Sequence, residues 1–206
     1  AVMCQISFNI GEKNEIYKDA LSETQPEVLE EGVNQFLDLN ARRLDGALSF
    51  LENRPDDKPF LLNLNFNIPH GATTGTMKQR KTDDEIYRTL YRDVEIPLPT
   101  NYIAKADIVT PKLPENIHHA KDRQNGYNYV DTPNDFRERY IRQLQCITGV
   151  DRMLGKLRKR LKKLKLDKNT IIIFTSDHGL FMGEHGIGGK ALCYEKTTHV
   201  PMILFN

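Results

Sequence analysis

Apolar residues recur along the chain with the period of a helix in two long stretches. From Pro26 to about Asn53 they return every three or four residues, as in an amphipathic helix with one buried side. A second and longer helix is predicted to start with Asn134 as its N-cap. The apolar side of this helix is predicted to contain Phe136, Tyr140, Leu144, Ile147, Leu154, Leu157, Leu161 and Leu164.

Shorter apolar runs predict strands at 2–8, 59–67, 170–177 and 200–206. The run at 59–67, PFLLNLNFN, is mostly apolar, which is typical of a strand covered on both faces. The run at 170–177, TIIIFTSD, has β-branched residues in a row and follows the long helix. A helix that leads into a strand, with loops at the strand's carboxyl end, indicates an α/β layer fold.

The region from about 72 to 133 shows poor periodicity and many charges. Two of its segments, VEIPLPTNY and VTPKLPENI, are predicted to be extended because proline disfavours helix at the preceding residue. Connections of this length are uncommon unless they are functional. We interpret the region as an irregular excursion over the sheet edge that lines a pocket.

Composition narrows the class of protein but not its chemistry. The chain has 206 residues, 39% hydrophobic residues and a net charge of +1, which suits one globular domain and implies no partner through bulk charge, nucleic acid included. No apolar run is long enough to span a membrane, and no secretory leader is recognisable at the start. Cys4, Cys146 and Cys193 are predicted to be buried free thiols, since their number and spacing suit neither a disulfide framework nor a metal knuckle.

One segment departs from this even charge. Residues 156–165, KLRKRLKKLK, hold seven basic residues in ten. They predict either a surface for nucleic acid or an anionic polysaccharide, or the solvated face of a packed helix, because three leucines keep helical spacing within the run.

Candidate chemistry lies at the carboxyl ends of the two apolar strands, where ligands bind in open α/β sheets. Asp177 and His178 follow the strand at 170–177 and are either two ligands of a divalent cation or the cap of a turn. His70 follows the strand at 59–67 and is either a proton donor or a structural residue. If both strands belong to one sheet, these side chains open on the same edge.

A glycine-rich loop follows Asp177 and His178 and ends at Lys190. A lysine beside an anion-binding pocket neutralises oxyanion charge, although a lone lysine is usually a solvated surface residue. Glu184 and His185 in the same loop are predicted to brace it or to line the pocket.

Taken together, three stretches resemble the sulfatases, the formylglycine-dependent branch of the alkaline phosphatase superfamily. They are KPFLLNLNFNIPHG, NTIIIFTSDHGLFMGEHG and GKALCYEKTTHVPMILF. The resemblance implies a partial alkaline-phosphatase-like α/β core, with a mixed, mostly parallel sheet flanked by helices. It also implies a sulfuric ester hydrolase with a small sulfated substrate, most naturally a sulfated sugar, in a periplasmic, secreted or lysosomal compartment.

The resemblance implies a role for each matching residue. Asp177 and His178 would be two ligands of one calcium ion. His70 would bind the sulfate group and protonate the leaving oxygen, and Lys190 would contact the sulfate and the bridging oxygen. A metal, a lysine and a histidine aimed at these oxygens would stabilise the charge that develops as the ester bond breaks.

The chain also departs from the family pattern. The sulfatase nucleophile is a formylglycine made from Cys or Ser in a C/S-x-P/A-x-R motif, and none of the three cysteines has that context. The early Asp-Asp pair of metal ligands and the Lys-x-His element are also missing, and Ala72 stands where the family often has proline. With the unusual ends of the chain, this predicts that residues 1–206 are part of a single sulfatase catalytic domain without its N-terminal portion and C-terminal subdomain, and are inactive in isolation.

Two alternatives remain. One is a phosphodiester or phosphonate hydrolase of the same superfamily, which shares the Asp-His strand end. The other is a non-catalytic module that binds sulfated glycans, for which the basic residues at 156–165 are the natural surface.

Overall fold

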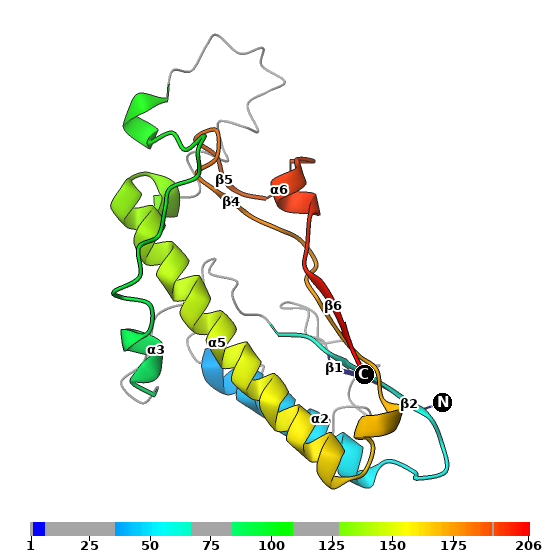
Figure 1. Cartoon of the computed structure of the whole chain (residues 1–206). Helices are drawn as coiled ribbons and strands as arrows, with labels where there is room; N and C mark the ends of the chain where they lie inside the picture. Colours follow the sequence, from blue (N-terminus) through cyan, green and yellow to red (C-terminus); the bar gives the residue numbers. More distant parts are fainter. Residues whose placement is uncertain (1, 7–35, 67–83, 109–127, 191) are drawn as a thin grey trace. The chain divides into compact units, whose positions relative to one another are not determined.

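The computed structural model describes residues 2–6, 36–66, 84–108, 128–190 and 192–206. These residues form two compact units, Ala1–Leu90 with Gln143–Lys168 and Tyr91–Arg142 with Asn169–Asn206. Both combine helices with short strands, so the described chain is a mixed α/β structure, as predicted (Figure 1). None of its helices is long and apolar enough to cross a bilayer.

In the first unit, strands β1 (Val2–Ile6) and β2 (Phe60–Leu64) form a parallel pair, with Val2 opposite Phe60. Helix α2 (Phe36–Asn53) connects them and contacts both strands. It ends at Asn53 as predicted, while the predicted first turns at 26–35 lie outside the described residues. Along β2 exposure alternates and Leu61 is 56% exposed, so within this unit one face of the strand is covered rather than both.

Helix α5 (Pro133–Lys163) crosses the boundary between the two units. Its buried residues in the first unit include Val150, Met153, Leu157 and Leu161. Helix α2 also has a buried side, which contains Leu44, Ala47 and Leu51. The two helices lie side by side in Figure 1, and an ion pair joins Arg160 to Glu52. The first unit also contains α3 (Ile86–Thr89) and a short 3-10 turn, η5 (Asp167–Asn169).

The second unit holds two antiparallel strand pairs. Strand β3 (Ile172–Thr175) pairs with β6 (Met202–Phe205), and β4 (Phe181–Met182) pairs with β5 (Gly188–Gly189). The described part of this unit also contains helix α6 (Glu195–Thr198) and the 3-10 turns η2 (Lys105–Asp107) and η4 (Asn128–Val130). The predicted strands at 170–177 and 200–206 are confirmed, but β2 and β3 pair with different partners. A single sheet that contains both strands therefore remains a prediction.

The start of α5 differs from the prediction by two residues. Thr132, not Asn134, is the N-cap: its Oγ1 accepts the backbone N–H of Asp135 at 3.1 Å and donates to the Asp135 carboxylate at 2.6 Å. Pro133 then occupies the first helical position, where its missing N–H has no consequence. Asn134 lies inside the first turn because the threonine and proline before it already satisfy both requirements of a helix start.

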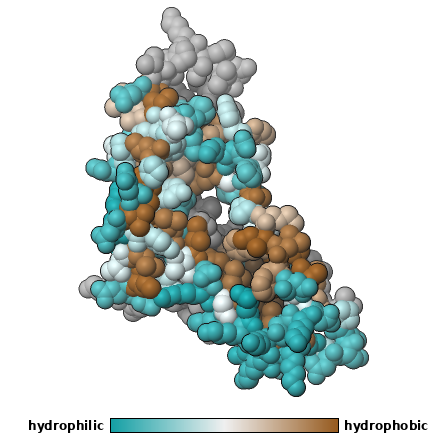
Figure 2. All heavy atoms as spheres, in the orientation of Figure 1, coloured by the Kyte–Doolittle hydropathy of each residue, from teal (hydrophilic) through white to brown (hydrophobic). Residues whose placement is uncertain are grey.

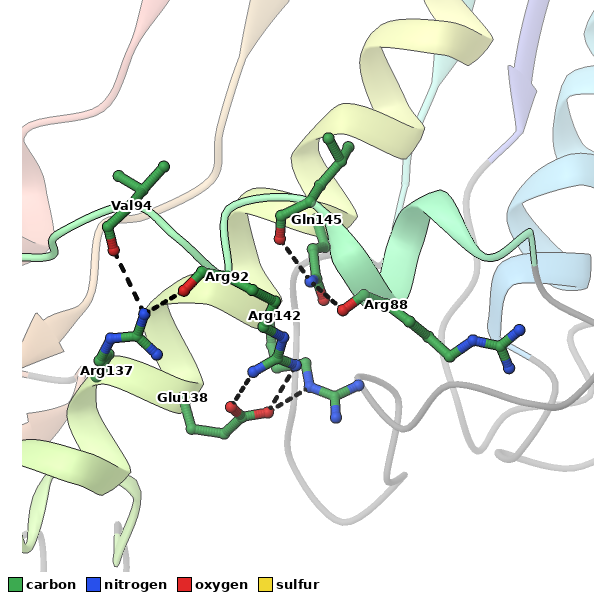
Figure 3. A network of polar contacts seen from close by, with 8 residues as sticks. Arg88, Arg92, Val94, Arg137, Glu138, Arg142 and Gln145 are labelled. Carbon is green, nitrogen blue, oxygen red and sulfur yellow. Dashed lines mark hydrogen bonds and ion pairs between the residues drawn. The ribbon is translucent and has the colours of Figure 1, made fainter.

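The buried side of α5 also differs from the predicted stripe. Tyr140 and Ile147 are exposed, and the polar residue Gln145 is buried. The Gln145 amide nitrogen donates to the carbonyl oxygens of Arg88 at 3.3 Å and Leu90 at 2.9 Å, where the chain leaves α3 (Figure 3). Because these bonds satisfy the buried amide, a glutamine can take a core position that periodicity assigns to an apolar residue. The thiol prediction is right for Cys146, which is buried, but wrong for Cys193, which is exposed.

Glu138 on α5 is the acid at the centre of an arginine cluster in the second unit. It bonds to Arg92 and, at 2.7 Å, to Arg142, while Arg137 donates to the Arg92 carbonyl at 2.5 Å (Figure 3). The hydrogen bond from Arg92 is the main reason that the pKa of Glu138 falls from 4.5 to about 2. The cluster ties the irregular segment after Tyr91 to the helix.

We expect acid to weaken this unit through Glu138. A depressed pKa means that the ionised form is favoured in the folded state, so its contribution is complete above about pH 4.5 and is lost as the pH falls toward 2. The carboxylate is 48% exposed, so screening limits the effect to about 1 kcal/mol. Urea unfolding at pH 6 and pH 3 should show a smaller acid loss for Glu138→Gln than for the unchanged chain. The exposed Glu95→Gln is the control, and an equal acid loss in both variants would contradict the assignment.

Helix α5 ends in a Schellman arrangement with a lysine in the position that favours glycine. Lys165 has φ +57°, its N–H bonds to the Lys162 carbonyl at 3.0 Å, and the Leu166 N–H bonds to the Leu161 carbonyl at 2.9 Å. We expect Lys165→Gly to raise the free energy of unfolding by about 0.5–1 kcal/mol, because glycine adopts this backbone conformation without strain. The matched control, Lys163→Gly, removes the same charge from a helical position and should lower stability by about 1 kcal/mol. Equal effects of both changes in urea unfolding would show that the φ angle is not the cause.

Candidate functional site

The Asp177-His178 pair lies in the turn directly after β3. Asp177 Oδ1 accepts the backbone N–H of His178 at 3.0 Å, and the Ser176 hydroxyl donates to the His178 carbonyl at 3.1 Å. These bonds shape the turn, as the cap interpretation predicted. The Asp177 side chain is nevertheless 84% exposed, and its second oxygen lies 3.5 Å from His178 Nε2. The pair therefore caps its own turn and still offers a carboxylate oxygen to a ligand.

The hydrogen bonds of His178 define which ring nitrogen carries the proton. Nδ1 lies 2.7 Å from the Gly179 carbonyl oxygen, which can only accept, so Nδ1 is the donor. Nε2 contacts Lys190 Nζ, and an ammonium group can only donate. In the tautomer that satisfies both contacts, Nδ1 carries the proton and the Nε2 lone pair is directed toward Lys190. This is also the tautomer in which a histidine binds a metal through Nε2.

Gly179 fixes this turn against α6. Its N–H donates to the Thr197 carbonyl at 2.9 Å, and a Cβ built on Gly179 would lie 2.1 Å from the Lys196 carbonyl oxygen. Two backbone segments this close leave no room for any side chain. Thr197 is buried, and its hydroxyl bonds to the carbonyls of Leu192 and Tyr194, which holds α6 in place.

The glycine-rich loop forms a tight hairpin, β4 to β5, whose turn runs through positive φ angles. Gly183, His185 and Gly186 have φ of +96°, +56° and +68°, and Gly189 in β5 has φ +82°. Of the two roles predicted for Glu184, the contacts favour that of a brace: it is buried, its carboxylate accepts the Met182 N–H at 2.6 Å, and it pairs with Lys196 at 3.4 Å. His185 is exposed, and its ring bonds to Asn101 at 3.0 Å.

Residues from the irregular excursion at about 72–133 support this hairpin. The Ile103 N–H donates to the Gly183 carbonyl at 3.3 Å, and the Tyr102 hydroxyl donates to the Val130 carbonyl at 2.8 Å. Burial, together with neighbouring carboxylates, raises the pKa of Tyr102, so this hydroxyl remains a donor at neutral pH. Tyr129 accepts the Gly189 N–H at 2.7 Å through its hydroxyl oxygen, directly before Lys190. The described part of the excursion therefore supports the loop.

The structure thus brings together three of the four predicted site residues: Asp177, His178 and Lys190. All three belong to the second unit. The fourth, His70, lies outside the described residues. No periodic pattern or motif identified Tyr102 and Tyr129, because each acts through a contact far away along the chain.

A sulfatase family model matches residues 11–206, nearly the whole chain. The chain belongs to the sulfatase family. Among curated relatives, the N-acetylglucosamine-6-O-sulfatase of Bacteroides thetaiotaomicron is 27% identical over 78% of this chain and 36% of its own length. Human iduronate 2-sulfatase is 30% identical over 77% of this chain and 29% of its own length. This sulfatase chain therefore spans about a third of the length of these relatives.

Solved structures confirm the fold at low sequence identity. A protein in complex with its substrate, D-glucosamine-2-N,6-O-disulfate, has a TM-score of 0.53 and 22% identity over 80% of this chain and 42% of its own. The phosphonate monoester hydrolase of Agrobacterium radiobacter has a TM-score of 0.58 and 19% identity over 81% of this chain and 32% of its own. The sulfatase chain shares the α/β fold of both proteins.

The donor set of this sulfatase chain fits part of a cation site. An exposed Asp177 oxygen and His178 Nε2, 3.5 Å apart, have the chemistry and spacing of two neighbouring ligands. The described residues contain no group of three or more His, Cys, Asp or Glu side chains that could hold a metal ion. Calcium takes six to eight ligands, so any complete set would include groups beyond these two.

Proposed function

We propose that this chain is part of the catalytic domain of a sulfatase that hydrolyses the sulfate ester of a sulfated sugar. The observation that carries the proposal is the contact of Lys190 with His178, beside Asp177, at the end of β3 in a chain that matches the sulfatase model over residues 11–206. The sugar class is supported by the relative named for N-acetylglucosamine and by the disulfated glucosamine bound to a protein of the same fold.

Asp177 and His178 would hold one divalent cation, which we propose to be calcium. When bound, the cation supplies positive charge that favours an anionic substrate. Lys190 and such a cation need the same His178 lone pair. Cation binding therefore requires the Lys190 ammonium to donate elsewhere, and the oxygens of a sulfate ester are acceptors of matching charge.

Each remaining role concerns the ester bond between sulfur and oxygen. As this bond breaks, negative charge develops on the bridging oxygen, and a fixed ammonium group such as Lys190 stabilises that charge. We assign His70 to binding of the sulfate and protonation of the leaving oxygen. Asp177 keeps its turn closed through the His178 N–H, which holds the imidazole next to Lys190.

The nucleophile would lie outside this sequence. The chain contains no Cys or Ser in a C/S-x-P/A-x-R motif, so we propose that formylglycine is supplied by another part of the complete protein, which resides in a periplasmic, secreted or lysosomal compartment. On the same basis the 206-residue chain alone should turn over no sulfate ester.

The test compares substrates on the complete protein that contains this chain. We expect hydrolysis of a sulfated glucosamine and of 4-nitrophenyl sulfate, loss of activity with a chelator, and recovery with calcium. Preference for a phosphonate or phosphate ester of the same alcohol would instead favour the second activity found on this fold. Inactivity toward every ester, with metal binding intact, would identify a non-catalytic module.

A further inference from the structure

The positive charge of this chain is concentrated near the C-terminal end of α5. Residues 156–165 contain five lysines, two arginines and no acid. The whole chain carries only +1, so the residues outside this run carry −6 together, the difference between +1 and +7. The rest of the chain is acidic, so the positive charge of this run is a local feature and the protein as a whole is not basic.

The helix holds these charges outward on a fixed support. Leu157 and Leu161 are 7% and 3% exposed, so one side of α5 is packed in the first unit. Lys156, Lys159, Lys162 and Lys163 are exposed. The first, second and fourth of them lie three and four residues apart, which places them in one row along the helix. We call these four lysines the basic face.

Among the residues that the structure describes, the basic face has no acidic partner. Glu52 pairs with Arg160, which lies on the flank of the face. Within the described ranges, no ion pair reaches any of the four lysines of the face. Lysines four residues apart, such as Lys159 and Lys163, repel each other and destabilise the helix slightly. An anion that bridges them would remove this repulsion. Figure 2 shows hydrophilic atoms gathered over this end of α5.

We propose that the basic face binds the anionic chain of a sulfated polysaccharide, apart from the residues that act on the ester. The choice of a sulfated chain rests on the proposed function, since such a polymer would present many sulfate groups. Nucleic acid fits less well: proteins that bind single strands combine basic residues with aromatic side chains on which bases stack, and residues 156–165 contain no aromatic residue. Retention of a polymer on the protein would raise the effective concentration of its esters.

The experiment measures binding of the full 206-residue chain to a fluorescent heparin decasaccharide by anisotropy at several salt concentrations. We expect affinity to fall as salt rises, because screening weakens contacts between exposed charges. Lys159→Gln with Lys163→Gln should weaken binding by about tenfold, and Gln at all four positions should weaken it further. Glutamine keeps the helix propensity of lysine, and circular dichroism verifies that α5 is retained.

A charge-matched control is Lys58→Gln with Lys105→Gln, two exposed lysines outside the basic face. We expect this pair to change affinity by less than twofold. Equal weakening by both pairs would overturn the proposal, and so would equal or tighter binding of single-stranded DNA with the same number of charges. No turnover is measured, so the outcome does not depend on the proposed hydrolysis. If the complete protein proves inactive on sulfate esters while this binding persists, the proposed function alone fails.

Discussion

Replacement of Lys190 by alanine is expected to lower the kcat of the complete sulfatase by about 10²–10³-fold. The reason is that removal of a preorganised donor aimed at developing charge raises the activation free energy by about 3–4 kcal/mol. Lys190 is half-buried and follows a glycine whose N–H is anchored by Tyr129, so the backbone that carries Lys190 is fixed before substrate binds. Steady-state kinetics of the purified variant with a sulfated sugar measure the effect.

The leaving group shows where Lys190 acts. If its ammonium stabilises the bridging oxygen, the loss of kcat should be larger for a sugar sulfate, whose alcohol is a poor leaving group, than for 4-nitrophenyl sulfate. Lys105→Ala, at an exposed lysine paired with Asp131, is the control and should leave both rates within twofold. A Lys190→Ala enzyme that retains a third or more of its activity on the sugar sulfate would remove Lys190 from the proposed mechanism.

The local part of the site could be predicted from sequence because its determinants are close together along the chain. Asp177 and His178 follow an apolar run, and the glycines after them permit the positive φ angles of the hairpin. The position of Lys190 rested on the resemblance to sulfatases, and the structure brings it to His178. Glu184 was predicted to brace the same loop or to line the pocket, and its burial and two contacts favour the first role.

What could not be predicted depends on partners distant in sequence. Gln145 is buried on α5 and Ile147 is exposed, contrary to the prediction. Carbonyl oxygens near α3 satisfy the Gln145 amide, and the spacing of apolar residues in α5 does not predict these distant partners. Tyr102 and Tyr129 support the hairpin from a region without periodicity. The start of α5 was placed at Asn134 since asparagine is a good N-cap, although Thr132 followed by Pro133 gives a stronger signal.

The hairpin that carries Lys190 should be highly sensitive to a single methyl group at Gly183. This residue has φ +96°, and a Cβ there would lie 2.4 Å from Tyr102 Cδ2. The backbone conformation costs an L residue about 1–2 kcal/mol, and overpacking adds about 1–3 kcal/mol. The Tyr102 ring cannot turn aside freely because its hydroxyl bonds to the Val130 carbonyl. We therefore expect Gly183→Ala to lower the free energy of unfolding by about 2–5 kcal/mol in urea denaturation.

Gly155 in α5 provides the matched control, because a Cβ there would meet no atom within 4 Å. Gly155→Ala should raise stability by about 0.5–1 kcal/mol, since alanine is the better helix former. A double-mutant cycle with Tyr102→Leu separates the two costs at Gly183. If the clash contributes, Gly183→Ala should cost less in the Tyr102→Leu background, with the strain of the positive φ remaining. An identical cost in both backgrounds would assign the whole effect to the backbone, and a neutral Gly183→Ala would show that the hairpin does not keep this turn in solution.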